Sequence, residues 1–428
     1  MNNFKINFIN HSCFKVQMKN FSFLVDPWFT GTVFNNSWKL LKETNISEID
    51  LSDLKYIFIS HEHPDHLNFK TLKEIYEINK DVEIIFPYRK DPLVKRVLEK
   101  IGFKFHFIKQ NSEKFFIDES NYVKFFSNNM WGDHTIVFSI DNKIIVNQND
   151  DYTENNTVKK IIKEFKEIDL FFTQFSLAGY YANSDNPSEI MEKGHKYHLN
   201  RVKNYFNDFK PKILVPFASY VYFCKESNKF LNNFSVKPSE VLNLLGSKNC
   251  QLVYFNDEIY LDHSFEERNI ENTKKLEKLF QIDNKKEFIP TQKLEEIQVK
   301  DIIQKKIEKI SFFQKMEVLV NNNNSIKKNI LGFIKIFYLI TDIKIYVYDI
   351  KKIIRFNLFS KKLSISDYDK DSKFDFSIPS EDLLFMFKFP WGSDTVNISS
   401  TVNHYSKKSL IFFFFLKRHY YKFGFKGA

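Results

Sequence analysis

The stretch "YIFISHEHPDHLNF" (Tyr56–Phe69) constrains the fold more than any other part of the sequence. A short apolar run, typical of a buried β-strand, ends in three histidines and two acidic residues within six positions. Imidazole nitrogens and carboxylate oxygens are good ligands for Zn, Mn or Fe. The spacing suits two neighbouring metal positions, one at His61 and His63 and the other at Asp65 and His66. The alternative is a run of surface histidines at a helix start, with Asp65 only capping the helix.

The segments around this motif alternate between strands and helices. Residues 4–9, 13–17 and 21–25 predict a meander of short strands, and two strand–helix pairs follow, up to residue 101. Residues 105–146 are strand-rich again, and helices then alternate with "DLFFTQF" and "KILVPFA". This repeated order predicts a layered α/β domain over residues 1–265.

Residues 266–428 are expected to form a helical connection and a smaller α+β module. Its predicted strands include "KIYVYDI", "IIRFNLF" and "DLLFMFKF", and "FFFFL" (Phe412–Leu416) is interpreted as a buried strand. Because these segments are strongly apolar, we expect the module to pack against the first domain and help to wall the substrate cleft.

The excess positive charge lies in the C-terminal part. Residues 266–428 hold 30 Lys and Arg against 20 Asp and Glu, whereas residues 1–265 hold 33 of each. We interpret the excess as a solvated basic surface, the alternative being attraction of an anionic substrate, a nucleotide or a membrane. No basic cluster accompanies a nucleic-acid motif, so nucleic-acid binding is not expected.

Cysteine usage and hydropathy indicate a cytoplasmic protein. Cys13, Cys224 and Cys250 form no CxxC pair, which argues against disulfides, zinc–thiolate sites and iron–sulfur sites. The N-terminus lacks the pattern of a signal peptide. Charged residues interrupt the most apolar long window, so no transmembrane segment is expected. The sequence does not indicate an oligomeric state.

The pattern His61-x-His63-x-Asp65-His66 resembles the HxHxDH signature of the metallo-β-lactamase superfamily. The resemblance implies an αββα sandwich with its site at one edge between the sheets. It also implies a hydrolase with one or two Zn²⁺ ions, or alternatively Fe or Mn, that acts through a metal-bound hydroxide. Asp65 and His66 would then be catalytic, with Asp65 orienting the water as well as binding metal.

A narrower resemblance covers more of the chain. "LVDPWFTGTVFNNSWKLL", the histidine motif, "PKILVPFASY" and "SEDLLFMFKFPWGSDTVNISS" are similar to the CMP-N-acetylneuraminate hydroxylase family. That family begins with a Rieske domain, whose two Cys and two His ligands we do not find in this sequence. The resemblance implies a small, anionic substrate from sugar-nucleotide or polysaccharide metabolism. The alternatives to a hydrolase are a non-haem iron oxygenase with an external reductant and a binding protein with a degenerate site.

The resemblance also implies further ligands. The third histidine of the superfamily falls at or near Asn129, with Asp133 and His134 as nearby alternatives, and His134 could equally be a strand-edge residue. The bridging carboxylate is Asp150, with Asp151 next to it, unless Asp150 is only a turn residue.

The last histidine of the superfamily has no counterpart after "VPFA", where Tyr220, Lys225 and Glu226 stand. His195 and His198 could approach from a helix, although we favour surface positions for them. Tyr220, Lys225 and His11 are candidates for substrate contact. Asp26 is expected to hold a ligand histidine by its second nitrogen.

Overall fold

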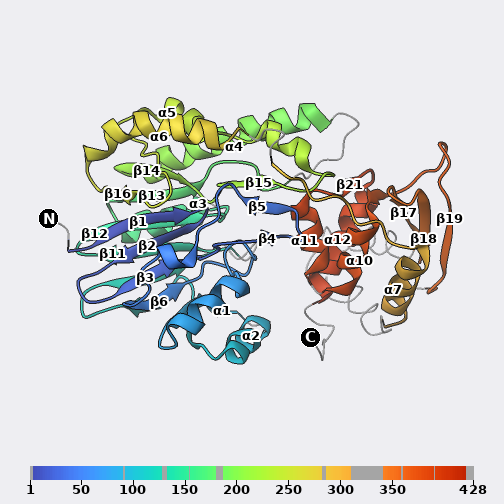
Figure 1. Ribbon diagram of the computed structural model, residues 1–428, viewed down its shortest axis with the longest axis horizontal. Coiled ribbons are helices and arrows are strands. Elements are labelled where there is room, and N and C mark those ends of the chain that lie inside the picture. The colour runs from blue at the N-terminus through green and yellow to red at the C-terminus, as the bar shows by residue number, and fades with distance from the viewer. Residues whose placement is uncertain are drawn as a thin grey trace.

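The computed structural model describes residues 3–89, 92–127, 133–153, 155–179, 187–281, 286–309, 341–357, 360–389 and 391–420. Two units lie side by side in Figure 1, a layered N-terminal unit and a C-terminal unit that contains α10, α11 and α12.

The first sheet has seven strands, and it begins with the predicted meander. β1, β2 and β3 are antiparallel, and β3, β6, β7 and β8 then run parallel. The order across the sheet is β16 (Glu258–Ile259), β1 (Lys5–Asn10), β2 (Cys13–Gln17), β3 (Ser22–Val25), β6 (Leu54–Phe58), β7 (Glu83–Pro87) and β8 (Lys104–Ile108).

The second sheet has six strands and repeats this plan. Neighbours from β9 to β12 are antiparallel, whereas β12, β13 and β14 run parallel. The order is β14 (Ile213–Phe217), β13 (Leu170–Gln174), β12 (Lys143–Asn149), β11 (Thr135–Ile140), β10 (Tyr122–Phe126) and β9 (Lys114–Phe116).

Phenylalanines from the inner faces of the two sheets fill the space between them. The rings of Phe14 and Phe172 stack at 4.8 Å, and those of Phe23 and Phe138 at 5.4 Å. Because strand side chains alternate, Leu24, next to Phe23, faces outward into a second apolar cluster that includes side chains of the covering helices. These helices are α1 (Phe69–Ile78) and α2 (Leu93–Ile101) on the first sheet, and α3 (Asn155–Glu164), α4 (Pro187–Phe209), α5 (Pro238–Leu245) and α6 (Glu266–Leu279) on the second (Figure 1). The predicted αββα sandwich is confirmed.

A small third sheet connects the sandwich to the C-terminal unit. It contains β4 (Thr32–Val33), β5 (Trp38–Leu40) and β15 (Val221–Phe223). Its apolar side chains belong to a cluster with Trp28, Phe34 and, from the C-terminal unit, Ile398. Short 3-10 helices cover Ile46–Glu48, Lys229–Phe234 and His263–Phe265.

The C-terminal unit is an α+β module with its own core, as expected. Its sheet has the order β19 (Leu363–Asp367), β18 (Lys352–Phe356), β17 (Ile343–Val347), β20 (Phe376–Ile378) and β21 (Asn403–His404). Its helices are α7 (Glu296–Lys309), α10 (Ser380–Lys388), α11 (Gly392–Ser399) and α12 (Lys407–Tyr420).

Two segments of this module that the sequence analysis interpreted as strands are helical. "DLLFMFKF" lies in α10, where the buried Leu383, Met386 and Phe387 follow helical spacing. "FFFFL" lies in α12. Runs of Phe and Leu are compatible with a buried strand or a buried helix, so their composition could not decide between the two.

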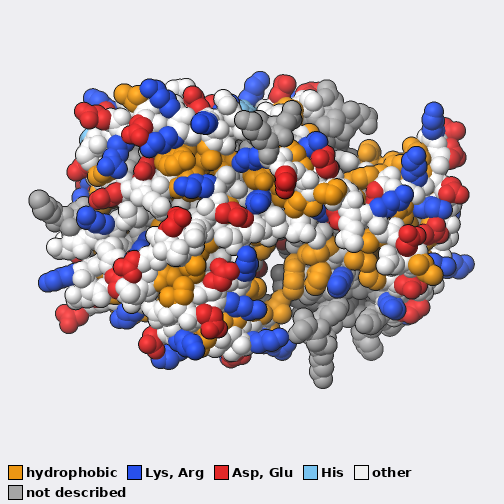
Figure 2. Space-filling view, viewed as in Figure 1, with side chains coloured by type: hydrophobic (Ala, Val, Ile, Leu, Met, Phe, Trp, Pro, Cys, Tyr) orange, Lys and Arg blue, Asp and Glu red, His pale blue; other side chains and the backbone are white. Residues whose placement is uncertain are grey.

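The division after residue 265 stays a proposal. Helix α6 lies beyond this boundary but packs on the first unit, since Leu276 and Phe280 belong to the core of the sandwich. Figure 2 shows basic and acidic side chains interspersed over the face in view. Among the described helices, none is both long and apolar enough to cross a membrane.

A buried histidine in the C-terminal module predicts sensitivity to acid. Burial lowers the pKa of His404 to about 4, whereas the unfolded chain protonates near pH 6.5. The unfolded state therefore binds more protons below pH 6.5, and stability is lost as the pH falls from there toward 4. We expect the free energy of unfolding of the His404→Gln variant to fall by about 2–3 kcal/mol less than that of the wild type over this pH range. Urea unfolding of both proteins at pH 7 and pH 4.5 measures it, and an identical pH dependence would contradict the prediction.

Candidate metal centre

The loop after β6 carries the histidine motif into the edge between the two sheets. The amides of His66 and Leu67 both donate to the carbonyl of His63, at 3.0 and 2.7 Å, which folds the loop back on itself. The N-cap of α1 is Asn68, whose side chain accepts from the amide of Thr71 at 3.1 Å. Asp65 is therefore not the helix cap, and its buried carboxylate faces two histidines instead.

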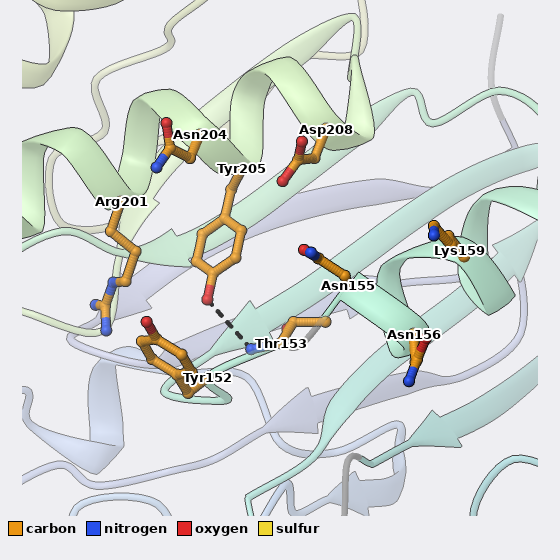
Figure 3. Close-up of a pocket in the computed structure, with 9 residues that line it drawn as sticks. All are labelled: Tyr152, Thr153, Asn155, Asn156, Lys159, Arg201, Asn204, Tyr205 and Asp208. Atoms are coloured by element: carbon orange, nitrogen blue, oxygen red, sulfur yellow. Dashed lines mark hydrogen bonds between the residues drawn. The ribbon is translucent and has the colours of Figure 1, made fainter.

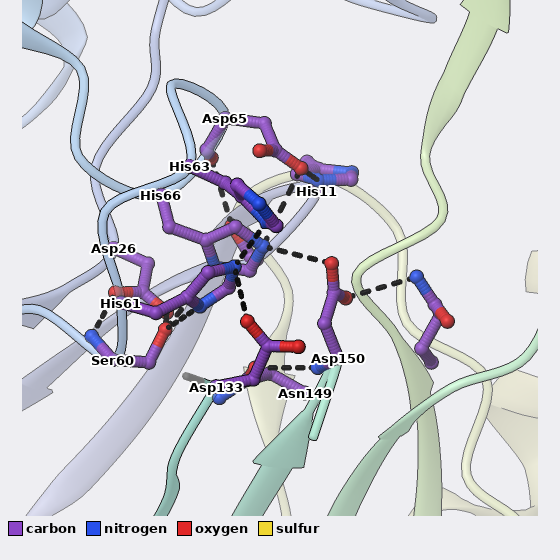
Figure 4. Close-up of polar contacts among 12 residues, drawn as sticks. His11, Asp26, Ser60, His61, His63, Asp65, His66, Asp133, Asn149 and Asp150 are labelled. Carbon is purple, nitrogen blue, oxygen red and sulfur yellow. Dashed lines mark hydrogen bonds and ion pairs between the residues drawn. The ribbon is translucent and has the colours of Figure 1, made fainter. Parts of the chain in front are cut away.

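Two groups of side chains could each hold a metal ion (Figure 4). The first contains His11, Asp65 and His66, and the second contains His61, His63 and Asp150. Within each group one ligand atom from every residue lies within 4.8 Å of the others. Each group thus offers two imidazoles and one carboxylate.

Contacts within the first group are short. Asp65 Oδ2 lies 3.2 Å from His11 Nε2 and 3.4 Å from His66 Nε2. His11 was expected to contact substrate, whereas the structure brings it together with two of the predicted ligands.

Asp150 connects the two groups. Its Oδ2 lies 3.4 Å from His66 Nε2, although it also belongs to the group of His61 and His63. Its Oδ1 accepts from Gln174 Nε2 at 2.9 Å. This is the position expected for a bridging carboxylate. The neighbouring Asp151 turns away, and its Oδ2 accepts from Thr135 Oγ1 at 2.7 Å.

Asp26 fixes the ring orientation of His66 directly and that of His61 through Ser60. Its Oδ2 lies 2.9 Å from His66 Nδ1, and its two oxygens accept from the amide and hydroxyl of Ser60 at 2.8 and 2.7 Å. Since the Ser60 hydroxyl donates to Asp26, it can accept from His61 Nδ1 at 2.9 Å. Both histidines thereby present Nε2 toward the centre, which is the arrangement found behind metal-binding histidines.

Two buried polar atoms in this centre point to a cation. His66 Nε2 and Asp65 Oδ1 have no hydrogen-bond partner among the described residues. Leaving such atoms unsatisfied in a buried site is costly, and a coordinated cation would satisfy both. The donor set, with imidazole and carboxylate only, fits Zn, Fe or Mn.

The backbone is strained at the strand ends that meet here. His11, Asp26 and Asn149 have φ values of 33°, 44° and 39°, in the left-handed region that disfavours residues other than glycine. They follow or end β1, β3 and β12, respectively. Strain of this kind persists where the surroundings over-determine it, which is common at functional sites.

The pKa values of the ionisable groups in the centre are shifted in different directions by their surroundings. Burial, with His66 and His63 nearby, lowers the pKa of His61 well below its usual range. Burial alone would lower the pKa of His66, but Asp65, Asp150 and Asp26 raise it well above the usual range. Burial would likewise raise the pKa of Asp65, but His66 and His11 hold it well below its usual range.

The expected position of the third histidine is only partly described. Asn129 lies outside the described residues. Asp133 Oδ1 lies 3.7 Å from His61 Nε2, so a carboxylate approaches the centre here. His134 is buried and lies close enough to His61 to lower the pKa of His61. Among the described residues, His134 belongs to neither group of candidate ligands.

Two expectations about the last part of the site are wrong. Tyr220 is fully buried in the core of the sandwich, and its hydroxyl donates to the carbonyl of Val253 at 3.2 Å. Lys225 is buried in ion pairs with Glu381 and Asp382 of the C-terminal module. Both side chains are buried with other partners and cannot contact a substrate, which sequence order alone does not reveal.

His195 has other partners, and His198 differs from its expected surface position. His195 Nε2 lies 2.8 Å from Glu240 Oε1, and its Nδ1 lies 2.9 Å from the carbonyl of Phe234. His198 is largely buried rather than exposed, and burial together with Arg201 lowers its pKa to about 2.

The sequence analysis missed one residue at the centre. Asp394, in α11 of the C-terminal module, has Oδ2 at 3.6 Å from His63 Nε2. The segment "FPWGSDTVN" carried the family resemblance, but nothing local marks its aspartate as a site residue because the contact depends on docking of the module.

A cavity of about 640 Å³ lies beside the centre, between α3 and α4 (Figure 3). Its lining is mostly polar: Tyr152, Thr153, Asn155, Asn156, Lys159, Arg201, Asn204, Tyr205 and Asp208. Arg201 Nη2 donates to Gln174 Oε1 at 2.8 Å, and Gln174 contacts Asp150. Two hydrogen bonds therefore connect this cavity to the candidate metal centre.

Replacing His61 and His63 together by Ala is expected to abolish metal retention by the second group while leaving the fold intact, because that group keeps only one of its three ligands. Metal analysis with circular dichroism measures both. His106→Ala serves as the control, since His106 is half-exposed on β8 and pairs with Glu83. Full metal content in the double variant would place the metal elsewhere.

Asp150→Ala is expected to lower the metal stoichiometry, most sharply for a second ion, because Asp150 contacts both groups. Titration with Zn²⁺ followed by elemental analysis measures the number of ions. Asp301→Ala, at an exposed position of α7, is the control. An unchanged stoichiometry would contradict the bridging role.

Comparison with known proteins agrees with this geometry. Residues 5–160 match the family described as "Beta-lactamase superfamily domain". The chain is 26% identical over 257 residues to the cytidine monophosphate-N-acetylneuraminic acid hydroxylase of Danio rerio, covering 57% of this chain and 43% of that protein. It thus spans less than half the length of this relative.

Solved structures that match part of this chain include two bacterial proteins. CmlA, a diiron β-hydroxylase from Streptomyces venezuelae, has 13% identity and a TM-score of 0.40, covering 60% of this chain and 54% of CmlA. YhfI, a metallo-β-lactamase fold protein from Bacillus subtilis, has 14% identity and a TM-score of 0.40, covering 60% of this chain and 99% of YhfI. Residues 5–160 thus carry a β-lactamase superfamily domain, and the sheets built around it have the order of the αββα sandwich expected from the sequence.

Proposed function

We propose that the protein is a metal-dependent hydrolase with a dinuclear centre. The observation that carries the proposal is the pair of two-histidine, one-carboxylate groups joined by Asp150 at the edge of the sandwich. A divalent ion bound there supplies Lewis-acid polarisation of the substrate and activation of water. Zn²⁺ is the ion we favour, with Fe or Mn as alternatives.

The chain's own residues then orient the reaction and handle protons. Asp26 and Ser60 fix the ring orientations of His66 and His61. Asp65 lies beside His11 and His66 in the first group, so its carboxylate would orient the attacking water as well as bind metal. We therefore assign the catalytic roles to Asp65 and His66. The apolar cluster around Trp28 and Phe34 limits the access of bulk water from one side.

We propose a small anionic substrate of the sugar-nucleotide class. The names of the hydroxylase relatives support this class. The cavity between α3 and α4 supports it independently, because Arg201 and Lys159 can meet an anionic group and Tyr152 offers an aromatic surface. His11, which was expected to contact substrate, is reassigned to the metal group. A cytoplasmic location is proposed as well, consistent with three buried, unpaired cysteines.

A second candidate function is a non-haem iron oxygenase. Two histidines and one carboxylate are also the ligand set typical of such enzymes, and both groups have it. Similarity to hydroxylases favours the same reading. Electrons would have to come from an external reductant.

Elemental analysis of protein purified without added metal tests these functions. Two Zn²⁺ per chain, with no oxygen consumption in the presence of CMP-sialic acid and a reductant, is the result expected for the hydrolase. Iron together with substrate-dependent oxygen consumption would favour the oxygenase. Protein that neither contains metal nor binds added Zn²⁺, Fe²⁺ or Mn²⁺ would leave a binding protein with a degenerate site and overturn both enzymatic proposals.

A further inference from the structure

The C-terminal module reaches into the candidate metal centre through one side chain. Asp394 Oδ2 lies 3.6 Å from His63 Nε2, and both side chains are about a quarter exposed, at 26% and 25%. The other ring nitrogen, His63 Nδ1, lies 3.0 Å from His61 Nε2. The two nitrogens of His63 therefore face different partners, one in the module and one in the centre.

Close packing within the module places Asp394. Gly392 begins α11, and a Cβ atom added there would lie 2.5 Å from the carbonyl oxygen of Phe385 and 2.7 Å from Met386 Cα. Only glycine allows the two helices to approach this closely, because backbone atoms cannot move aside as a side chain can. The position of α11, and with it that of Asp394, is thus tied to α10.

Helix α10 is in turn held by buried charges. Lys225 is 1% exposed, and its Nζ lies 2.8 Å from both Glu381 Oε1 and Asp382 Oδ1 in the first turn of α10. Breaking such a buried ion pair by removing one partner is strongly destabilising, so the pairing fixes where α10 docks.

The far end of α11 is held as well. Asn228 Nδ2 donates to the carbonyl of Ser37 at 3.2 Å and to that of Ser399 at 2.8 Å, which joins the two units. Ile398 enters the apolar cluster that contains Phe34, and the ring of Phe34 lies 5.9 Å from that of His63. Both ends of the α10–α11 pair are therefore fixed against the sandwich, on either side of Asp394.

We propose that Asp394 is a positioning residue for His63, so that the docked C-terminal module completes the metal centre. With its proton on Nε2, His63 faces the Asp394 carboxylate at 3.6 Å, and the lone pair of Nδ1 is then directed at the same point as His61 Nε2. A carboxylate behind a ligand histidine fixes its tautomer and ring orientation and raises its basicity. The inference rests on the metal centre of the proposed function.

The test compares metal binding by the full-length wild type, Asp394→Asn and Asp394→Glu. Zinc dissociation constants come from competition with a chromophoric chelator, and Co²⁺ substitution reports the ligand field at the site. We expect Asp394→Asn to weaken the affinity for one of the two ions about 10- to 100-fold and to shift the visible absorption bands of the Co²⁺-substituted protein. Asp394→Glu, which keeps the carboxylate, is expected to recover most of the affinity.

The control is Asp371→Asn, which removes the same charge from an exposed loop of the module. Thermal unfolding without metal checks that each variant is folded. If Asp394→Asn binds both ions within twofold of the wild type, or if Asp394→Glu is as weak as Asp394→Asn, the positioning role is overturned. A wild type that binds no metal would overturn the proposed function itself, so the two failures are distinguishable.

Discussion

The contact between Asp26 and His66 is the constraint on which the centre depends. Asp26 and His66 are fully buried, and a buried charge is tolerated only when it is paired and hydrogen-bonded. The pairing turns His66 Nε2 toward Asp65 and Asp150, and through Ser60 it also sets the ring of His61. Without this carboxylate, both imidazoles would be free to rotate, and the two ligand groups would lose their common orientation.

The sandwich makes this arrangement possible because it brings strand ends from both sheets to one edge. β3 and β6 deliver Asp26 and the histidine loop from the first sheet, and β12 delivers Asp150 from the second. Since the phenylalanine layer between the sheets fixes their spacing, the distance between His66 and Asp150 follows from the packing of the core. The strained backbone at His11, Asp26 and Asn149 is stable because the same core holds the strands on either side.

What the sequence could predict depends on how locally each contact is determined. The histidine motif lies on one loop, and its residues meet as expected because a few backbone dihedrals decide their geometry. Asp150 was predicted from its place at a strand end; the structure brings it near both groups, and its role as a bridging ligand stays a prediction. The prediction that Tyr220 contacts substrate was wrong because a shift of one residue along a strand changes the face on which a side chain lies. No local pattern near "VPFA" indicates this register. Asp394 was missed, and α10 was taken for a strand, because both depend on how distant segments pack.

The contacts of the C-terminal module with the sandwich also change how its net positive charge is interpreted. Its excess of Lys and Arg was interpreted as a solvated basic surface, with attraction of an anionic substrate, a nucleotide or a membrane as the alternative. The charged side chains by which α10 and α11 meet the sandwich are acidic among the described residues: Glu381 and Asp382 contact Lys225, and Asp394 contacts His63. An acidic edge beside a cationic centre strengthens cation binding and does not steer anions. Under the proposed function, attraction of an anionic substrate would therefore fall to bound ions and to Arg201 and Lys159, which line the cavity of the sandwich, while the module would orient His63.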